Sequence, residues 1–290
     1  MKFRCKVTDG VAMKELSNIT TGISKLSKEC VLRIVPRKLC IIISNDDKGP
    51  KKPFVWCELP VNFYFKEFNM FGVAEESNEI YLSVSTAMLA RCLNVLKQNV
   101  VFIKIKLTNR QTPCLTIEIE QNTESTRSIQ RVHDIPVEII LKQYWQDYAE
   151  PVFNDFHVSI EMPNLRLVKT IVESMKSMNP TINVSANKYG RLSLQIKTNT
   201  VSLSAHYPDL SVQSFAVGST FLHDDGDNEE ELFETVSATV DVKKFLMFLT
   251  GMQLHNARTI CSIVHNRMVK FYLEQNGSLS LQYYLTQVSL

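Results

Sequence analysis

Lysines and arginines in four segments with helical spacing are the residues of this 290-residue chain whose pattern most clearly indicates a binding site. Ten basic residues fall in these segments, against three glutamates: Lys14, Lys25, Lys28, Arg91, Lys97, Arg166, Lys169, Lys176, Lys243 and Lys244. The segments therefore carry +7, and since the whole chain carries +2, the remainder carries −5. Lysines that share one surface bind a polyanion through its phosphates without reading its sequence. We predict that these ten residues face duplex DNA; the alternative is an ordinary solvated surface.

Groups typical of catalysis or metal binding are scattered. The six histidines have no metal-ligand spacing, and His133 and Asp134, adjacent on an expected strand, must point to opposite faces. The chain contains no glycine-rich phosphate loop, no G-x-S-x-G and no H-E-x-x-H. We therefore predict no catalytic residues, no metal and no cofactor. A metal-dependent nuclease is the enzymatic alternative, although no cluster of carboxylates favours it.

Composition indicates a globular chain of two domains, with 44% hydrophobic and 21% charged residues. No apolar run approaches the about 18 residues that span a bilayer, and the N-terminus lacks the apolar stretch of a signal peptide. The seven cysteines include no C-x-x-C pair and mostly lie in apolar runs, as reduced core cysteines do. We expect a location in the cytosol or nucleus and no membrane partner.

A repeated unit must position the basic residues: a strand, an amphipathic helix and two further strands. The expected helices are Val11–Glu29, Thr86–Gln98, Asn164–Ser177 and Val242–Met252. In the first helix, Leu16, Ile19, Ile23 and Leu26 form an apolar stripe with a period near 3.6 residues. Successive helices start 75, 78 and 78 residues apart, which indicates a fourfold repeat. We predict an α+β fold, with two similar domains at 1–140 and 156–290 and basic helices on the side opposite the sheets.

The expected connecting loop, 141–155, is aromatic and acidic and includes Tyr144, Trp145 and Tyr148. Its aromatic residues either dock on the body of the protein, the more ordinary outcome, or receive a partner. Two further segments, Asp46–Pro53 and the acidic run His223–Glu234, have the composition of solvated loops. A contact between the acidic run and a basic partner is the less favoured alternative.

Several segments along the chain resemble one family. They are Met1-Lys2-Phe3-Arg4, Val55-Trp56-Cys57-Glu58-Leu59, Asn78-Glu79-Ile80-Tyr81-Leu82, Lys106-Leu107-Thr108-Asn109, His133-Asp134-Ile135-Pro136-Val137 and Ser280-Leu281-Gln282-Tyr283-Tyr284. Together they resemble the Hus-type subunit of the heterotrimeric DNA-damage checkpoint clamp, a relative of proliferating cell nuclear antigen. The resemblance covers essentially the whole chain.

The resemblance implies a DNA sliding-clamp fold and a non-catalytic role in the nucleus, with a cytoplasmic pool. It implies a ring of this chain and two other clamp subunits around duplex DNA at damage sites, with a clamp loader and with checkpoint and repair proteins as partners. The alternatives are a homotrimeric replication clamp and a monomeric scaffold without a role on DNA.

The resemblance also implies two kinds of partner-binding residue. Edge strands that join neighbouring subunits are placed at Arg127, Ile129, Arg131, His133, Val201, Leu203, Ala205 and Tyr207. A pocket for partner peptides is placed at Ile140, Tyr144, Met268, Tyr283 and Tyr284. Gln287 stands where such clamps usually have a proline, so we expect the usual partner motif not to fit unchanged.

Overall fold

The computed structural model describes residues 1–45, 52–94, 99–122, 128–153, 155–216, 235–252, 257–275 and 277–288. Two compact units make up the chain: Met1–Pro151 with Gln275–Leu281, and Val152–Glu274 with Gln282–Leu290. The expected connecting loop is thus divided between the units after Pro151. Lys97, Arg127, the acidic run 223–234 and most of the 46–53 loop lie outside the described residues.

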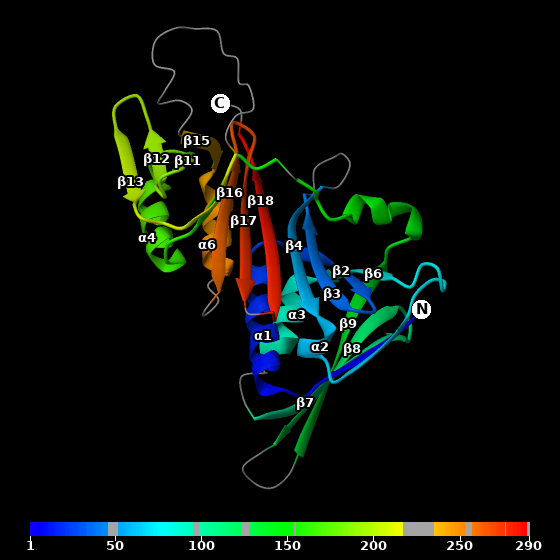
Figure 1. Ribbon diagram of the computed structural model, residues 1–290. Coiled ribbons are helices and arrows are strands. Elements are labelled where there is room, and N and C mark those ends of the chain that lie inside the picture. Colours follow the sequence, from blue (N-terminus) through cyan, green and yellow to red (C-terminus); the bar gives the residue numbers. More distant parts are fainter. Residues whose placement is uncertain are drawn as a thin grey trace. The chain divides into compact units, whose positions relative to one another are not determined.

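The described residues of the first unit form nine strands of one antiparallel arrangement, three helices and a 3-10 helix (Figure 1). Its elements are β1 (Lys2–Val7), α1 (Gly10–Ser24), β2 (Glu29–Val35), β3 (Lys38–Ser44), β4 (Pro53–Pro60), α2 (Val61–Tyr64), β5 (Glu67–Phe71), β6 (Ile80–Ser85), α3 (Thr86–Leu93), β7 (Val100–Asn109), β8 (Pro113–Asn122), β9 (Ser128–Ile139) and η2 (Lys142–Tyr148). Hydrogen bonds connect the strands in the order β4-β3-β2-β6-β9-β8-β7-β1-β5.

The described residues of the second unit form two antiparallel groups of strands and two long helices. Its elements are β10 (Val158–Glu161), α4 (Leu165–Met175), β11 (Thr181–Asn187), β12 (Leu192–Lys197), β13 (Ser202–Tyr207), β14 (Val212–Phe215), β15 (Thr235–Asp241), α6 (Val242–Gly251), β16 (Arg258–Val264), β17 (Met268–Gln275) and β18 (Leu279–Thr286). The strand orders are β14-β10-β16-β17-β18 and β13-β12-β11-β15. Residues 275 and 279–281 of β17 and β18 are grouped with the first unit.

Each expected helix is present, and each begins at a side chain that caps free backbone N–H groups. Asp9, Ser85 and Asn164 accept hydrogen bonds from residues in the first turns of α1, α3 and α4. Asp241 accepts from two amides of α6, at 2.7 and 2.9 Å. Such caps satisfy N–H groups that have no partner inside the helix. The repeat of strand, helix, strand and strand is confirmed four times, at β1-α1-β2-β3, β6-α3-β7-β8, β10-α4-β11-β12 and β15-α6-β16-β17.

The helices pack in pairs within each unit, α1 on α3 in the first and α4 on α6 in the second. Apolar residues of α1, among them Leu16, Ile19 and Ile23, are buried, as the periodicity predicts. However, α1 ends at Ser24 rather than at residue 29. The N–H groups of Lys25 and Leu26 bond the carbonyl oxygens of Gly22 and Ile23, at 3.1 and 2.9 Å, and these tighter i to i−3 bonds close the helix.

Strand β4 shows where the sequence pattern was insufficient. Residues up to Pro53 were assigned to a loop, yet β4 begins at Pro53 and pairs with β3 along its length. The register shifts between Ile43 and Ser44, opposite this proline, and a strand tolerates a residue without an N–H group at such an irregularity. All seven cysteines are buried and unpaired, as predicted. None of the described helices is long and apolar enough to cross a membrane.

Candidate nucleic-acid interface and partner surfaces

Four of the basic residues predicted to face DNA lie in the first unit, and all four are exposed: Lys14, Lys25, Lys28 and Arg91. Lys14 and Lys25 are eleven residues apart, about three turns of α1, so both leave the helix on the side opposite its buried stripe. Lys28 lies past the end of α1, in the turn before β2, and Arg91 occupies the last turn of α3.

Five more of these residues lie on α4 and α6 of the second unit. Arg166, Lys176, Lys243 and Lys244 are exposed. Lys169 is less available, because its ammonium lies 3.3 Å from the Glu173 carboxylate one turn away. All nine described residues therefore lie on or directly after the repeat helices, and their contact with DNA stays a prediction.

The first predicted subunit edge corresponds to β9. Residues 137–139 of this strand pair with β6, whereas 128–136 pair with β8 alone among the described strands. Ile129 and Val132 are 45% and 50% exposed. Nε2 of His133 is buried, and none of the described residues pairs with it. Asp134 contacts Thr116 and Arg110 instead of its neighbour His133.

The second predicted edge is β13, which among the described strands pairs with β12 alone. Val201, just before this strand, and Leu203 are 48% and 37% exposed. The Tyr207 hydroxyl is buried without a hydrogen-bond partner in the described part of the chain, and burial raises the pKa of this phenol. Residues 128–136 of β9 and strand β13 therefore each have backbone groups on one side that no described strand pairs with, beside exposed apolar side chains.

The five residues predicted to form a peptide pocket do not share one environment. Tyr283 is fully buried: its hydroxyl donates to the Lys244 carbonyl oxygen at 2.9 Å and its ring packs 5.1 Å from that of Phe248. Tyr283 is therefore a core residue beneath α6, and its assignment to a surface pocket was wrong. Because side chains alternate along β18, Tyr284 faces the other side of the strand.

Tyr284 belongs to an apolar cluster of the second unit. It packs with Val264 and Met268, and Phe156 lies against all three. The ring of Phe153, from the expected connecting loop, lies 5.4 Å from that of Tyr284, and the Lys270 ammonium lies 5.6 Å from the same ring. Met268 and Tyr284 are thus the two pocket candidates that the structure places in contact.

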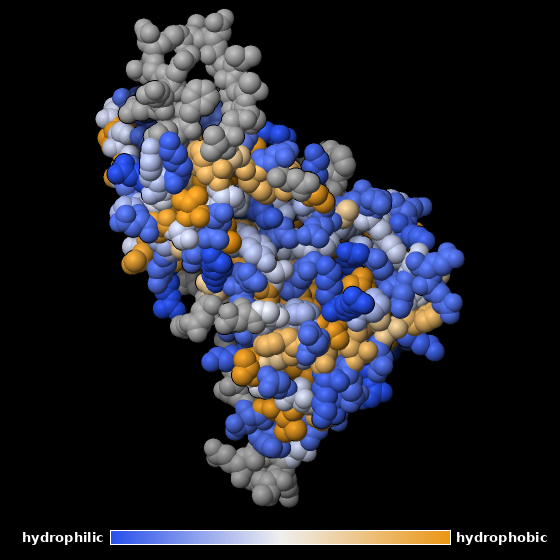
Figure 2. All heavy atoms as spheres, viewed as in Figure 1, coloured by the Kyte–Doolittle hydropathy of each residue, from blue (hydrophilic) through white to orange (hydrophobic). Residues whose placement is uncertain are grey.

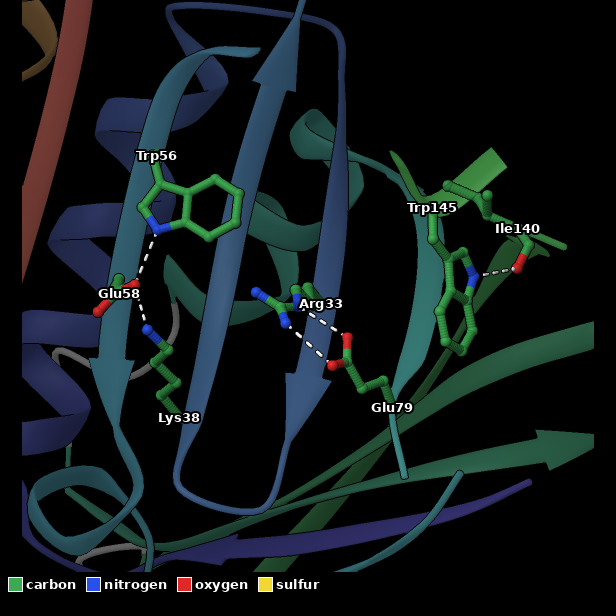
Figure 3. Close-up of polar contacts among 7 residues, drawn as sticks. All are labelled: Arg33, Lys38, Trp56, Glu58, Glu79, Ile140 and Trp145. Carbon is green, nitrogen blue, oxygen red and sulfur yellow. Dashed lines mark hydrogen bonds and ion pairs between the residues drawn. The ribbon is translucent and has the colours of Figure 1, made fainter. Parts of the chain in front are cut away.

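Ile140 and Tyr144 both lie in the first unit. Ile140 and Trp145 (Figure 3) pack against an apolar cluster of the sheet there. Trp145 donates its indole N–H to the Ile140 carbonyl oxygen at 3.0 Å and stacks on Tyr81 with a centroid distance of 4.7 Å. Tyr148 is buried against the same cluster, which includes Trp56. Trp145 and Tyr148 therefore dock on the body of the protein, which was the more ordinary of the two expectations. Tyr144 is the exception, because it remains 50% exposed.

An ion pair beside this docking site orders the same sheet face. Arg33 donates two hydrogen bonds to Glu79, at 2.9 and 3.0 Å, and the arginine lies over the rings of Trp56 and Tyr81 (Figure 3). The hydrogen bonds from Arg33 lower the pKa of Glu79. Lys38 and the Trp56 indole both donate to Glu58, at 2.5 and 2.8 Å. These polar contacts fix the aromatic surface on which the loop rests.

Replacing Trp145 with alanine is expected to lower the free energy of unfolding by about 2–3 kcal/mol, because it removes a stacked ring and its hydrogen bond. Tyr144→Ala is the matched control, since its half-exposed side chain should cost less than about 0.5 kcal/mol. Urea titration of both variants, with limited proteolysis of the loop, measures the difference. Equal stability of the two variants would show that Trp145 does not anchor the loop.

The potential metal ligands of the described residues lie apart from one another. The described residues contain no group of three His, Cys, Asp or Glu side chains that could hold a metal ion. Burial raises the pKa of the Cys30 and Cys40 thiols to about 12, so neither is a ready nucleophile.

Two units, each built from two repeats of a strand, a helix and two further strands, define a subunit of the sliding-clamp class. Solved clamp structures confirm this fold over the whole chain. The proliferating cellular nuclear antigen of Entamoeba histolytica matches with a TM-score of 0.70 at 11% identity, covering 99% of both chains. The PCNA of A. fulgidus, solved with the C-terminal region of FEN-1, matches with a TM-score of 0.67 at 10% identity and the same coverage.

The chain belongs to the Hus1-like family, whose family model matches residues 1–289. It is 40% identical over 289 residues to the checkpoint protein HUS1 of Homo sapiens, covering 100% of both chains. It is 27% identical over 292 residues to the checkpoint protein Hus1-like of Drosophila melanogaster, again over 100% of both. The protein is therefore a subunit of the checkpoint type of sliding clamp.

Proposed function

We propose that this chain joins two different clamp subunits in a heterotrimeric ring that encircles duplex DNA at damage sites. There the ring activates checkpoint signalling and tethers repair enzymes, after a clamp loader has placed it on DNA. The chain acts in the nucleus without catalysing a reaction and without a cofactor. The homotrimeric replication clamp is the second candidate, favoured only by the fold shared with the PCNA structures.

The observation that carries this proposal is that residues 128–136 of β9, and the whole of β13, each pair with a single neighbour among the described strands. One side of each segment is therefore open to another chain. Unused N–H and C=O groups on such strands form a template for pairing with another chain. Exposed apolar residues along both strands would be buried in such an interface. Two distinct edges allow two distinct neighbours, as a closed ring with unlike subunits requires.

The exposed lysines of the four helices supply the contact with DNA. A ring that holds DNA by encircling it needs only loose electrostatic contacts, which preserve sliding. Nine of the ten residues are described, and eight of these are exposed. Their common place on the repeat helices supports a role at the inner surface of the ring.

Light scattering of the purified chain, alone and mixed with candidate clamp subunits, tests the assembly. We expect a monomer that forms a ring of one copy of each subunit on mixing. The double variant Val201→Asp, Leu203→Asp should block the ring, whereas Phe71→Asp, at the exposed edge strand β5, is the matched control and should not. A stable trimer of the chain alone would favour the replication-type clamp, and a monomer under all conditions would refute the ring.

A further inference from the structure

One face of the sheet in the first unit carries a concentration of cations separate from the helices. Along β1, the side chains of Phe3, Cys5 and Val7 are buried in the core. Lys2, Arg4 and Lys6 alternate with them and therefore point away from the core. Lys104 and Lys106 take the same orientation on the neighbouring strand β7, because Ile103 and Ile105 are buried. We call these five residues, Lys2, Arg4, Lys6, Lys104 and Lys106, the basic sheet face.

The strand register places like charges directly opposite one another. Arg4 pairs with Lys106 and Lys6 pairs with Lys104 across the antiparallel ladder. Side chains in such positions have Cβ atoms about 5 Å apart, and like charges there destabilise a sheet. The arrangement therefore favours anions that neutralise these residues.

Acidic residues of the chain neutralise the basic sheet face only in part. Glu118 lies 2.6 Å from the Lys106 ammonium and 3.8 Å from that of Lys104, and these cations with Arg4 lower the pKa of its carboxyl. Arg4 reaches Glu67 only at 3.9 Å, with both side chains near half-exposed. Glu120 adds a third carboxylate on the same side of β8, against five cations.

The least neutralised cations lie on β1. The Lys6 ammonium lies 4.7 Å from the centroid of the Phe102 ring, a contact that leaves its positive charge in place. Lys2 pairs in register with Phe71 of β5, which carries no charge. Strand β1, in dark blue in Figure 1, pairs with β7 on one side and with β5 on the other. Lys6 pairs in register with Glu67 of β5, the same carboxylate that Arg4 reaches at 3.9 Å. One glutamate thus serves two cations of this row, and the row keeps a net positive charge for an anionic partner.

We propose that the basic sheet face binds an extended acidic segment of a partner protein, with carboxylate or phosphate groups at alternate residues. Alternate residues of a strand are about 6.6–6.8 Å apart, so an extended peptide presents its anions with the spacing of Lys2, Arg4 and Lys6. Such a peptide can place neutral residues beside Glu118. Duplex DNA fits less well, because its charge is continuous, at one negative charge per about 1.7 Å of axis, and would meet this carboxylate.

Fluorescence anisotropy on the full chain tests the proposal without requiring a ring, so its failure is separate from failure of the proposed function. The probes are labelled ten-residue peptides in which serine alternates with glutamate, with phosphoserine or with glutamine. Binding of the first two and not the third is expected, with an affinity that falls as salt rises. Comparison of the first two shows whether carboxylate or phosphate is preferred.

Variants with opposite expected effects make the test specific. Arg4→Gln with Lys106→Gln should weaken binding of the acidic peptides about tenfold, whereas Glu118→Gln should strengthen it about threefold. Lys188→Gln with Lys197→Gln, on exposed lysines of the second unit, is the matched control and should change nothing. Thermal unfolding checks that all variants fold. The proposal would be overturned if the control variant weakened peptide binding equally, or if the glutamine peptide bound. It would also be overturned if duplex DNA bound this face more tightly than the peptides do.

Discussion

A chain with Lys25→Glu, Arg166→Glu and Lys244→Glu is expected to enter the ring but to lose retention on closed circular duplex DNA. All three residues are exposed and lie on three different repeat helices or at their ends. Each lost phosphate contact should reduce the slope of log K against log salt by about 0.9, so three should reduce it by about 2.7. Reversal adds repulsion, and we expect binding to weaken at least about a hundredfold at low salt.

Gel filtration over a range of salt concentrations measures how much of the assembled ring stays on DNA circles. It gives both the salt dependence of binding and the loss of binding at low salt. The matched control, Lys25→Arg with Arg166→Lys and Lys244→Arg, changes the same three residues but keeps their charge. A ring with this variant should stay on DNA. A second control, Lys188→Glu with Lys197→Glu, changes charge elsewhere and should have little effect. If this second control lost as much DNA retention as the helix variant, net charge and not the helix surface would hold DNA.

Phe271→Ala is expected to cause the largest loss of stability, about 3–5 kcal/mol of the free energy of unfolding. Phe271 on β17 is fully buried and stacks on two residues of α6, with ring centroids 5.0 Å from Phe245 and 4.7 Å from Phe248. Its removal leaves a cavity under the helix that carries Lys243 and Lys244. The loss of an aromatic stack adds to the loss of buried area.

Urea unfolding followed by circular dichroism measures this loss. Phe153→Ala removes the same side chain from a position that is 42% exposed, and we expect it to cost about 1 kcal/mol or less. A Phe271→Ala variant no less stable than Phe153→Ala would mean that α6 is held by other contacts. In that case the apolar helix face beneath Lys243 and Lys244 would not fix their position.

The surface of the molecule explains why local patterns did not reveal the partner-binding residues. Figure 2 shows apolar patches scattered among hydrophilic side chains, and exposed residues such as Val152 and Leu203 do not form a periodic signal in the sequence. Tyr283 and Tyr284 are identical in type and adjacent, and both are buried, yet they pack on opposite sides of β18: Tyr283 lies beneath α6, and Tyr284 packs with Val264 and Met268. Only the direction of each side chain from β18 separates them.

The sequence by itself determined the four helices, their caps and their repetition. These depend on local forces: Asp9, Ser85, Asn164 and Asp241 cap amides two or three residues away, and apolar stripes repeat every 3.6 residues. It also predicted buried, unpaired cysteines and a basic set of helices.

Tertiary structure alone decided which strands pair, and therefore which charges meet. Lys6 and Lys104 lie 98 positions apart in the chain and face one another only because β1 pairs with β7 in one register. A shift of one residue would turn every one of these side chains to the core. The register is fixed by burial of Cys5, Val7, Ile103 and Ile105, so long-range packing, which no local pattern contains, created the basic sheet face.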